Sequence, residues 1–99
     1  MIYFVSRHEG AVTWIKQQPQ WQVDCFVRHL NPADIVAGDV VLGTLPLHLA
    51  AEVCTRGAAF YFLMLPQTAD GRGSEYSAEE MQQMGCSLQR FEVRALEAV

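Results

Sequence analysis

DVVLGTLPLHLAAEVCTRGAAFYFLML, residues 39–65, carries the clearest structural signal in the chain. A short apolar run occupies each end, at 40–42 within the expected strand 39–42 and at 59–65. Short unbroken runs of this kind are typical of strands that are covered on both faces. Between them, apolar residues recur at helical spacing, which predicts a helix that opens within 43–46 and ends at Gly57. The stretch therefore predicts a strand, a helix and a second strand, and the run at 59–65 should lie inside the sheet.

Further elements are expected before this unit. Residues 2–5 form an apolar run rich in β-branched and aromatic side chains, which predicts a buried strand. The apolar spacing at 11–15 predicts a helix after it. Residues 21–27 alternate enough to predict a second strand, and Phe26 on the polar face suggests that both faces are buried. A helical turn at 31–34 should connect this strand to the next.

Three features are expected after the unit. Residues 66–76, PQTADGRGSEY, have the composition of a surface loop. Ser77 and Glu80 have the spacing of a capping box, which predicts a short helix that ends at Gly85. The alternation at 86–96 predicts an edge strand with one face in solvent.

The order of these elements is strand, helix, strand, strand, helix, strand, helix, strand. Alternating strands and helices predict an α/β fold, and we expect a compact Rossmann-like domain with a mainly parallel sheet flanked by helices. At 99 residues, with 51% apolar and 18% charged side chains, the chain is expected to form one domain over residues 1–99.

Composition excludes several functional classes. Seven basic and eleven acidic residues give a net charge of −4, so a broad basic face for long nucleic acid is not expected. The N-terminal apolar run is short, lacks basic residues before it and precedes charged ones, so we expect a cytoplasmic protein with no membrane partner. The three cysteines show no CxxC spacing, which predicts buried thiols and neither a disulfide framework nor a metal site. No cofactor is expected.

Two polar segments follow predicted strands and run into predicted helices. The first consists of Ser6, Arg7 and His8, and the second of Gly43, Thr44, Leu45 and Pro46. In open α/β sheets, ligands bind beyond the carboxyl ends of the strands, where the strand order reverses. Helix N-termini and an arginine fork suit phosphate oxygens, and a glycine lets backbone approach a ligand closely. The two segments together predict a phosphate site, although Ser6 and Thr44 could each serve only as a helix cap.

The histidines and one loop arginine are further candidates. His8 could act as a general acid or base near neutral pH, but a lone histidine at a strand end is often structural. Arg72, between two glycines, could close over a bound anion or could simply be solvated. His48, with Glu52 beside it on a helix, and His29 are weaker candidates.

Three segments of the chain resemble a known family. They are YFVSRHEGAVTW at 3–14, HLNPADIVAGDVVLGTLPLHLAAEVCTRGA at 29–58 and RGSEYSAEEM at 72–81. They are similar to the small Csx proteins of type III CRISPR loci, a group regarded as cyclic oligoadenylate ring nucleases. The resemblance implies a CARF-related Rossmann-like fold, a homodimer, and binding and cleavage of cyclic tetra-adenylate without a metal.

The resemblance places both polar segments on family motifs. In the implied reaction, a ribose 2′-hydroxyl attacks the adjacent phosphorus. Arg7 and the N–H groups near Thr44 would stabilise charge, His8 would move a proton, and Ser6 or Thr44 would orient the ribose or phosphate. A two-fold dimer could grip opposite phosphates of the four-nucleotide ring, with Arg7 and Thr44 contributed by both chains.

Two other functions stay open from the sequence. The same pocket could serve a non-catalytic sink or sensor that binds the cyclic messenger and lowers its free concentration. A phosphatase or a mononucleotide-binding relative of flavodoxin would share only the fold, and the chain lacks a nucleophile motif such as CxxxxxR.

Overall fold

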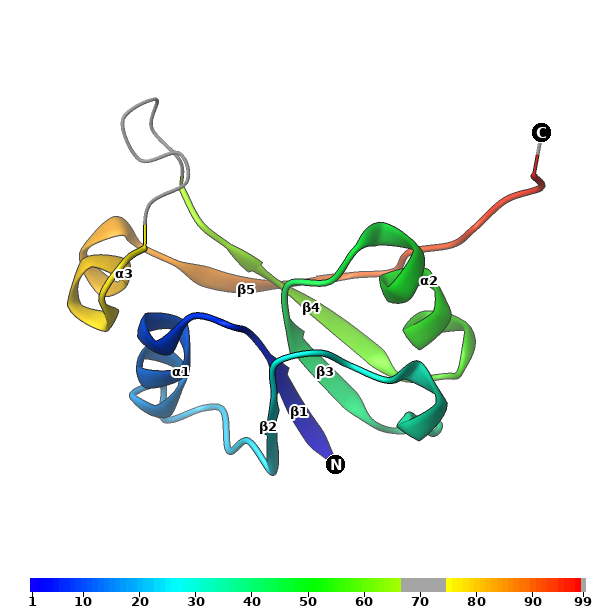
Figure 1. Ribbon diagram of the computed structural model, residues 1–99, viewed down its shortest axis with the longest axis horizontal. Helices are drawn as coiled ribbons and strands as arrows, with labels where there is room; N and C mark the ends of the chain where they lie inside the picture. The colour runs from blue at the N-terminus through cyan, green and yellow to red at the C-terminus, as the bar shows by residue number, and fades with distance from the viewer. Residues whose placement is uncertain (67–74, 99) are drawn as a thin grey trace.

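Nine elements follow one another along the chain in the computed structural model, which describes residues 1–66 and 75–98 (Figure 1). In order they are β1 (Ile2–Val5), α1 (Glu9–Lys16), β2 (Cys25–Val27), the 3₁₀ turn η1 (Pro32–Asp34), β3 (Val40–Gly43), α2 (Leu47–Thr55), β4 (Ala59–Met64), α3 (Ala78–Met84) and β5 (Ser87–Phe91). This order is the predicted one.

The five strands form one sheet in the order β2-β1-β3-β4-β5. The first four strands are parallel, and β5 runs antiparallel to β4. The chain steps from β1 to one side to form β2 and then crosses to the other side of β1 to form β3. The strand order therefore reverses between β1 and β3, which makes their carboxyl ends the topological switch point. The predicted α/β fold, with a mainly parallel sheet flanked by helices, is confirmed.

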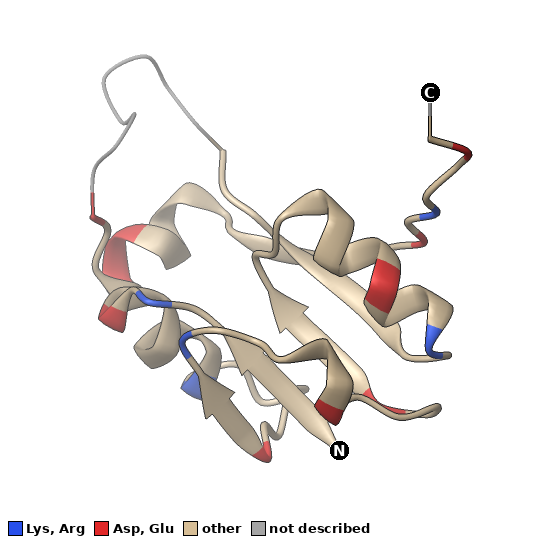
Figure 2. Cartoon of the chain, turned by 45° about the vertical axis from the view of Figure 1, so that its right-hand side comes forward, with Lys and Arg blue, Asp and Glu red and all other residues tan. Residues whose placement is uncertain are grey.

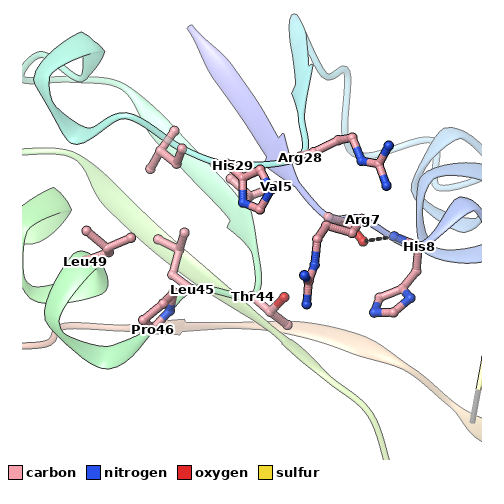
Figure 3. Close-up of a pocket in the computed structure, with 11 residues that line it drawn as sticks. Val5, Arg7, His8, Arg28, His29, Thr44, Leu45, Pro46 and Leu49 are labelled. Carbon is pink, nitrogen blue, oxygen red and sulfur yellow. Dashed lines mark hydrogen bonds between the residues drawn. The ribbon is translucent and has the colours of Figure 1, made fainter. Parts of the chain in front are cut away.

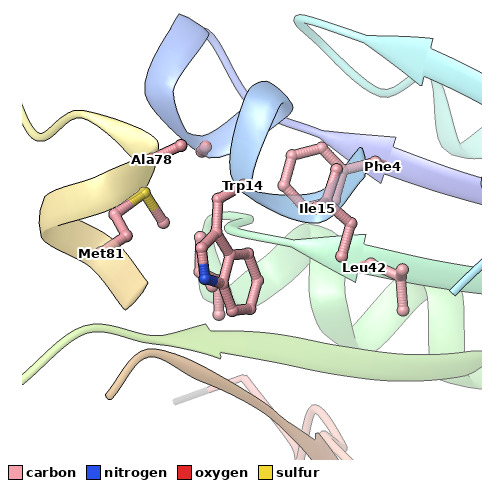
Figure 4. Packing of buried hydrophobic residues seen from close by; sticks show 8 residues of the cluster. Phe4, Trp14, Ile15, Leu42, Ala78 and Met81 are labelled. Carbon is pink, nitrogen blue, oxygen red and sulfur yellow. The ribbon is translucent and has the colours of Figure 1, made fainter. Parts of the chain in front are cut away.

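Apolar clusters lie on both faces of the sheet. Helices α1 and α3 cover one face, and α2 covers the other (Figure 1). The cluster under α1 and α3 comprises Phe4, Ala11, Trp14, Ile15, Leu42, Leu63, Ala78 and Met81 (Figure 4). The cluster under α2 and η1 comprises Val5, Leu30, Ile35, Val41, Ala50, Val53, Ala58 and Phe60. Because successive residues of β1 and β3 enter opposite clusters, these strands are apolar without interruption.

A buried carboxylate aligns the starts of β1 and β3. Asp39 is 6% exposed, and its Oδ1 accepts from the amino terminus of Met1 at 3.1 Å. Its Oδ2 accepts from the N–H of Val36 at 3.0 Å. The Val36 N–H bond and the amino terminus hold the pKa of Asp39 below its usual range, against the opposing effect of burial. This tie helps to fix the register that brings Val5 opposite Gly43 at the carboxyl ends of the two strands.

The second strand differs from its prediction. Only Cys25–Val27 of the expected 21–27 is a strand, and it lies at the edge of the sheet, paired with β1 alone. Just before this strand, the N–H of Asp24 donates to the Ile2 carbonyl at 2.8 Å, and Asp24 Oδ2 accepts from the N–H of Ile2 at 2.7 Å. Burial on both faces was the wrong expectation, because Phe26 is 41% exposed. Its ring is approached instead by Lys16 Nζ, 5.0 Å from the centroid.

The last strand is shorter than the predicted 86–96 but occupies the predicted edge. Phe91 pairs with Phe60, the second residue of β4, so almost no partner backbone remains beyond it. The other predicted elements lie within a few residues of the observed ones, and β4 lies inside the sheet as expected. Most of the loop predicted at 66–76 lies outside the described residues. Among the helices described, none has the length and hydropathy that a membrane crossing requires.

Both ends of α3 match the sequence prediction. Ser77 Oγ accepts from the N–H of Glu80 at 3.1 Å, and Glu80 Oε1 accepts from the N–H of Ser77 at 3.0 Å. This reciprocal pair is the predicted capping box. Gly85 ends the helix with a φ of 77°, a left-handed conformation that favours glycine. Local side-chain chemistry alone was enough to place this helix.

Candidate functional site

A pocket of about 470 Å³ opens beyond the carboxyl ends of β1, β2 and β3 (Figure 3). It is lined by Val5, Ser6, Arg7, His8, Arg28, His29, Leu30, Thr44, Leu45, Pro46 and Leu49. The lining comes from three loops that are far apart in sequence and meet because their strands are parallel neighbours. The pocket therefore lies at the switch point, where ligands bind in sheets of this type.

The loop after β1 supplies three polar side chains, more than either other loop. The N–H of Ser6 donates to the carbonyl of Val27 at 3.0 Å, which ties this loop to the end of β2. Ser6 Oγ accepts from the N–H of His8 at 3.1 Å, across the intervening Arg7. His8 is the N-cap residue of α1, but its side chain makes no capping hydrogen bond. The loop is thus held by its backbone and by Ser6, while Arg7 and His8 present exposed side chains.

The loop after β3 forms the opposite wall. Pro46 is the N-cap residue of α2, and its carbonyl accepts from the N–H groups of Leu49 and Ala50 at 3.0 Å each. Leu45 and Leu49 give this wall an apolar surface, and the Thr44 side chain is exposed beside it. The predicted segments 6–8 and 44–46 therefore meet in one pocket.

Gly43 lies behind the wall rather than in it. It is buried, has a φ of 125°, and is not among the residues that line the pocket. A Cβ atom at this position would lie 2.2 Å from the carbonyl oxygen of Val5. The close approach that this glycine permits is therefore between β3 and β1.

The loop after β2 adds residues that the sequence reasoning missed. Arg28 is not among the residues predicted from the sequence, and His29 is only a weak candidate there, yet both line the pocket. Arg28 also lines a neighbouring hollow of about 410 Å³, together with Ser6, Arg7 and His8. The carboxyl-end rule applied to the predicted strand 21–27 would have found them, because they follow its last residue directly.

One other candidate lies away from the pocket, and another falls outside the described residues. His48 is exposed on α2 and does not line it. Arg72 lies outside the described residues. Within residues 1–66 and 75–98, no three His, Cys, Asp or Glu side chains gather as a potential metal-binding group.

The pocket is basic although the chain is acidic. Lys and Arg are sparse over the described residues (Figure 2), and two of them, Arg7 and Arg28, line this one pocket. No acidic side chain is part of its described lining. Neither arginine has a carboxylate within ion-pair distance in the part of the chain that the structure describes. Two uncommitted guanidinium groups, two imidazoles and two hydroxyls suit an anion such as a phosphate ester.

The comparisons with known proteins give one match. The family described as "Putative CRISPR-associated protein (Cas_VVA1548)" matches residues 3–94. No curated protein and no solved structure matches the chain. The family match covers both loops that frame the pocket and agrees with the CRISPR association implied by the sequence resemblance. The chain belongs to the Cas_VVA1548 family of CRISPR-associated proteins.

Proposed function

We propose that the chain is a ring nuclease of type III CRISPR defence, which binds cyclic tetra-adenylate and cleaves it without a metal. The observation that carries this proposal is the convergence of Arg7, Arg28, His8 and Thr44 on one pocket at the switch point. These residues supply two phosphate-binding cations, a group that can transfer protons, and a hydroxyl. The family match and the resemblance to small Csx proteins support the same class of function.

Binding would combine charge with apolar contact. Arg7 and Arg28 can each form paired hydrogen bonds to the non-bridging oxygens of a phosphodiester. Leu45 and Leu49 offer an apolar surface against which an adenine base can pack. Because both phosphate-binding side chains are local to the pocket, the net charge of −4 does not oppose binding of a small anion.

The size of the pocket favours a homodimer. A volume of about 470 Å³ suits a ligand nearer one nucleotide than four, so one copy would enclose only part of the ring. A two-fold axis placed over the pocket would present Arg7 and Thr44 twice to a ring with rotational symmetry. Mass measurement in solution tests this: a dimer is expected with ligand at micromolar protein, and a persistent monomer would contradict it.

The proposed reaction is an in-line displacement at phosphorus. The ribose 2′-oxygen forms a bond to the adjacent phosphorus, and the bond from phosphorus to the 5′-oxygen breaks. His8 accepts the proton of the 2′-hydroxyl, and the leaving 5′-oxygen takes a proton from water, which gives a 2′,3′-cyclic phosphate and a 5′-hydroxyl. Arg7 stabilises the charge that develops on the non-bridging oxygens, and the Thr44 hydroxyl orients the ribose or phosphate.

Turnover of the pure protein tests the proposal. Cyclic tetra-adenylate is incubated with the protein in EDTA, and the products are followed by chromatography. Linear products that accumulate well beyond one ring per dimer are expected. Binding that saturates at one ring per dimer without product would instead identify a sink or sensor, and absence of binding would reject both functions.

A further inference from the structure

A carboxylate distant in sequence contacts the histidine of the pocket. Glu75 Oε1 lies 2.6 Å from His8 Nδ1, although 67 residues separate the two. The side chains are 70% and 54% exposed, so the contact is reached from the surface and burial does not enforce it. Some other constraint must bring Glu75 to this position.

The backbone beside Glu75 is fixed against α1. A Cβ atom on Gly10 would lie 1.8 Å from the carbonyl oxygen of Tyr76, so only glycine lets this backbone rest on the first turn of α1. The capping box at Ser77 then starts α3, which packs on α1. The side chains of the two helices are joined further along, where Trp14 Nε1 donates to Gln82 Oε1 at 3.2 Å. Glu75 is therefore delivered to His8 by the docking of α3 on α1.

Glu75 contacts His8 from outside the pocket. His8 lines both the main pocket and the neighbouring hollow, whereas Glu75 is part of the described lining of neither. The carboxylate thus holds the Nδ1 side of the ring, and within residues 1–66 and 75–98 no hydrogen bond joins Nε2 to another group. When the imidazole is neutral, a carboxylate at Nδ1 favours the tautomer with the proton on Nδ1, so the lone pair is on Nε2.

We propose that Glu75 is a positioning residue for His8. It orients the ring and fixes the tautomer in which Nε2 accepts the proton of the attacking hydroxyl. The tautomer rests only on the geometry of the pair, whereas its catalytic consequence rests on the proposed ring nuclease function.

The tautomer can be measured without any ligand. The ¹⁵N shifts of the His8 ring are recorded at a mildly alkaline pH, with the ring in its neutral form. We expect protonated Nδ1 in the parent chain and in a Glu79→Ala control, and a shift toward protonated Nε2 in Glu75→Ala. Glu79 is an exposed acid in the first turn of α3, and among the described residues it forms no hydrogen bond or ion pair with His8. Identical His8 spectra in the parent and Glu75→Ala would overturn the proposal.

Single-turnover cleavage measures the consequence. With protein saturating over cyclic tetra-adenylate, we expect Glu75→Ala to slow cleavage roughly tenfold or more and to leave Kd within about twofold. Glu75→Gln should recover part of the rate, because its amide oxygen still accepts from Nδ1–H, and Glu79→Ala should cleave as the parent does. Unchanged cleavage in Glu75→Ala would overturn the catalytic role. If the parent chain shows the expected tautomer but never cleaves cyclic tetra-adenylate, the proposed function is rejected. The proposed orientation of the His8 imidazole is then unaffected.

Discussion

Two of the three loops that line the pocket, those after β1 and β3, leave neighbouring parallel strands, yet they are held in opposite ways. The loop after β3 is fixed by backbone packing, because Gly43 rests on the carbonyl of Val5 and Pro46 begins α2. The loop after β1 is fixed by polar contacts: the Ser6 N–H donates to the Val27 carbonyl, the His8 N–H donates to Ser6 Oγ, and Glu75 contacts the His8 ring. The loop after β3 builds an apolar wall, and the loop after β1 carries three polar side chains, Ser6, Arg7 and His8.

This difference separates stability from function within one site. Substitutions that alter the close packing of β3 on β1 should weaken folding, since backbone cannot move aside cheaply. Substitutions of exposed side chains in the loop after β1 should leave folding nearly intact and change binding or turnover. Variants of each loop can test this division.

The largest effect is expected for Gly43→Ala. The new Cβ atom would meet the Val5 carbonyl at 2.2 Å, and the φ of 125° is one that residues with a side chain rarely adopt. Strain and overpacking together should lower the free energy of unfolding by roughly 3 kcal/mol or more, measured by urea denaturation.

Gly38→Ala is the matched control. Gly38 also has a positive φ, of 92°, but a Cβ atom at this position would have no neighbour within 4 Å. In this variant only the backbone strain should lower the free energy of unfolding, by about 1 kcal/mol. If the free energy of unfolding falls equally in the two variants, the close contact between β3 and β1 adds nothing to the cost of Gly43→Ala.

The next effect is expected for His8→Ala, in the chemical step. Cyclic tetra-adenylate should still bind nearly normally. Its single-turnover cleavage should slow roughly a hundredfold, the usual scale for a lost general acid or base. Stability should stay close to that of the parent, because the His8 side chain is 54% exposed. Cleavage at the parent rate would leave catalysis to positioning and electrostatics from Arg7 and the helix N-termini.

Arg7→Ala should weaken binding and slow cleavage together. Loss of a charge-assisted contact to phosphate should cost roughly 1.5 to 3 kcal/mol, read from Kd and from the single-turnover rate. Arg28→Ala should show the same direction if both arginines contact the ligand. Arg56→Ala is the control, because Arg56 pairs with Glu52 on α2 at 3.4 Å and does not line the pocket. A similar loss of binding in Arg56→Ala would point to a diffuse charge effect instead of a local site.

The smallest effect is expected for Thr44→Val in the loop after β3. This change keeps the shape of the side chain and removes only the hydroxyl, so Kd and the cleavage rate should change by about threefold. Isothermal titration and single-turnover assays give both values. If cleavage by Thr44→Val slows as much as cleavage by His8→Ala, the division between the two loops is contradicted. The loop after β3 would then take part in catalysis.

Residue types and their spacing were enough to predict most of the fold. Continuous apolar runs at 2–5, 40–43 and 59–64 report strands buried on both faces, because successive side chains point to opposite sides. Ser77, Glu80 and Gly85 define α3 through hydrogen bonds and a backbone conformation that are local to the helix. Features of this kind involve residues close in sequence, so the sequence reveals them directly.

The tertiary structure was needed to identify the edge strand β2 and the complete set of residues at the site. The second strand was predicted too long and too buried, since nothing in residues 21–27 shows that β2 has β1 as its sole neighbour. Arg28 joins Arg7 only because the two strands that precede them are parallel and adjacent. Glu75 reaches His8 only because α3 docks on α1. Strand order and helix docking depend on contacts between distant segments, and no local pattern of residues encodes those contacts one by one.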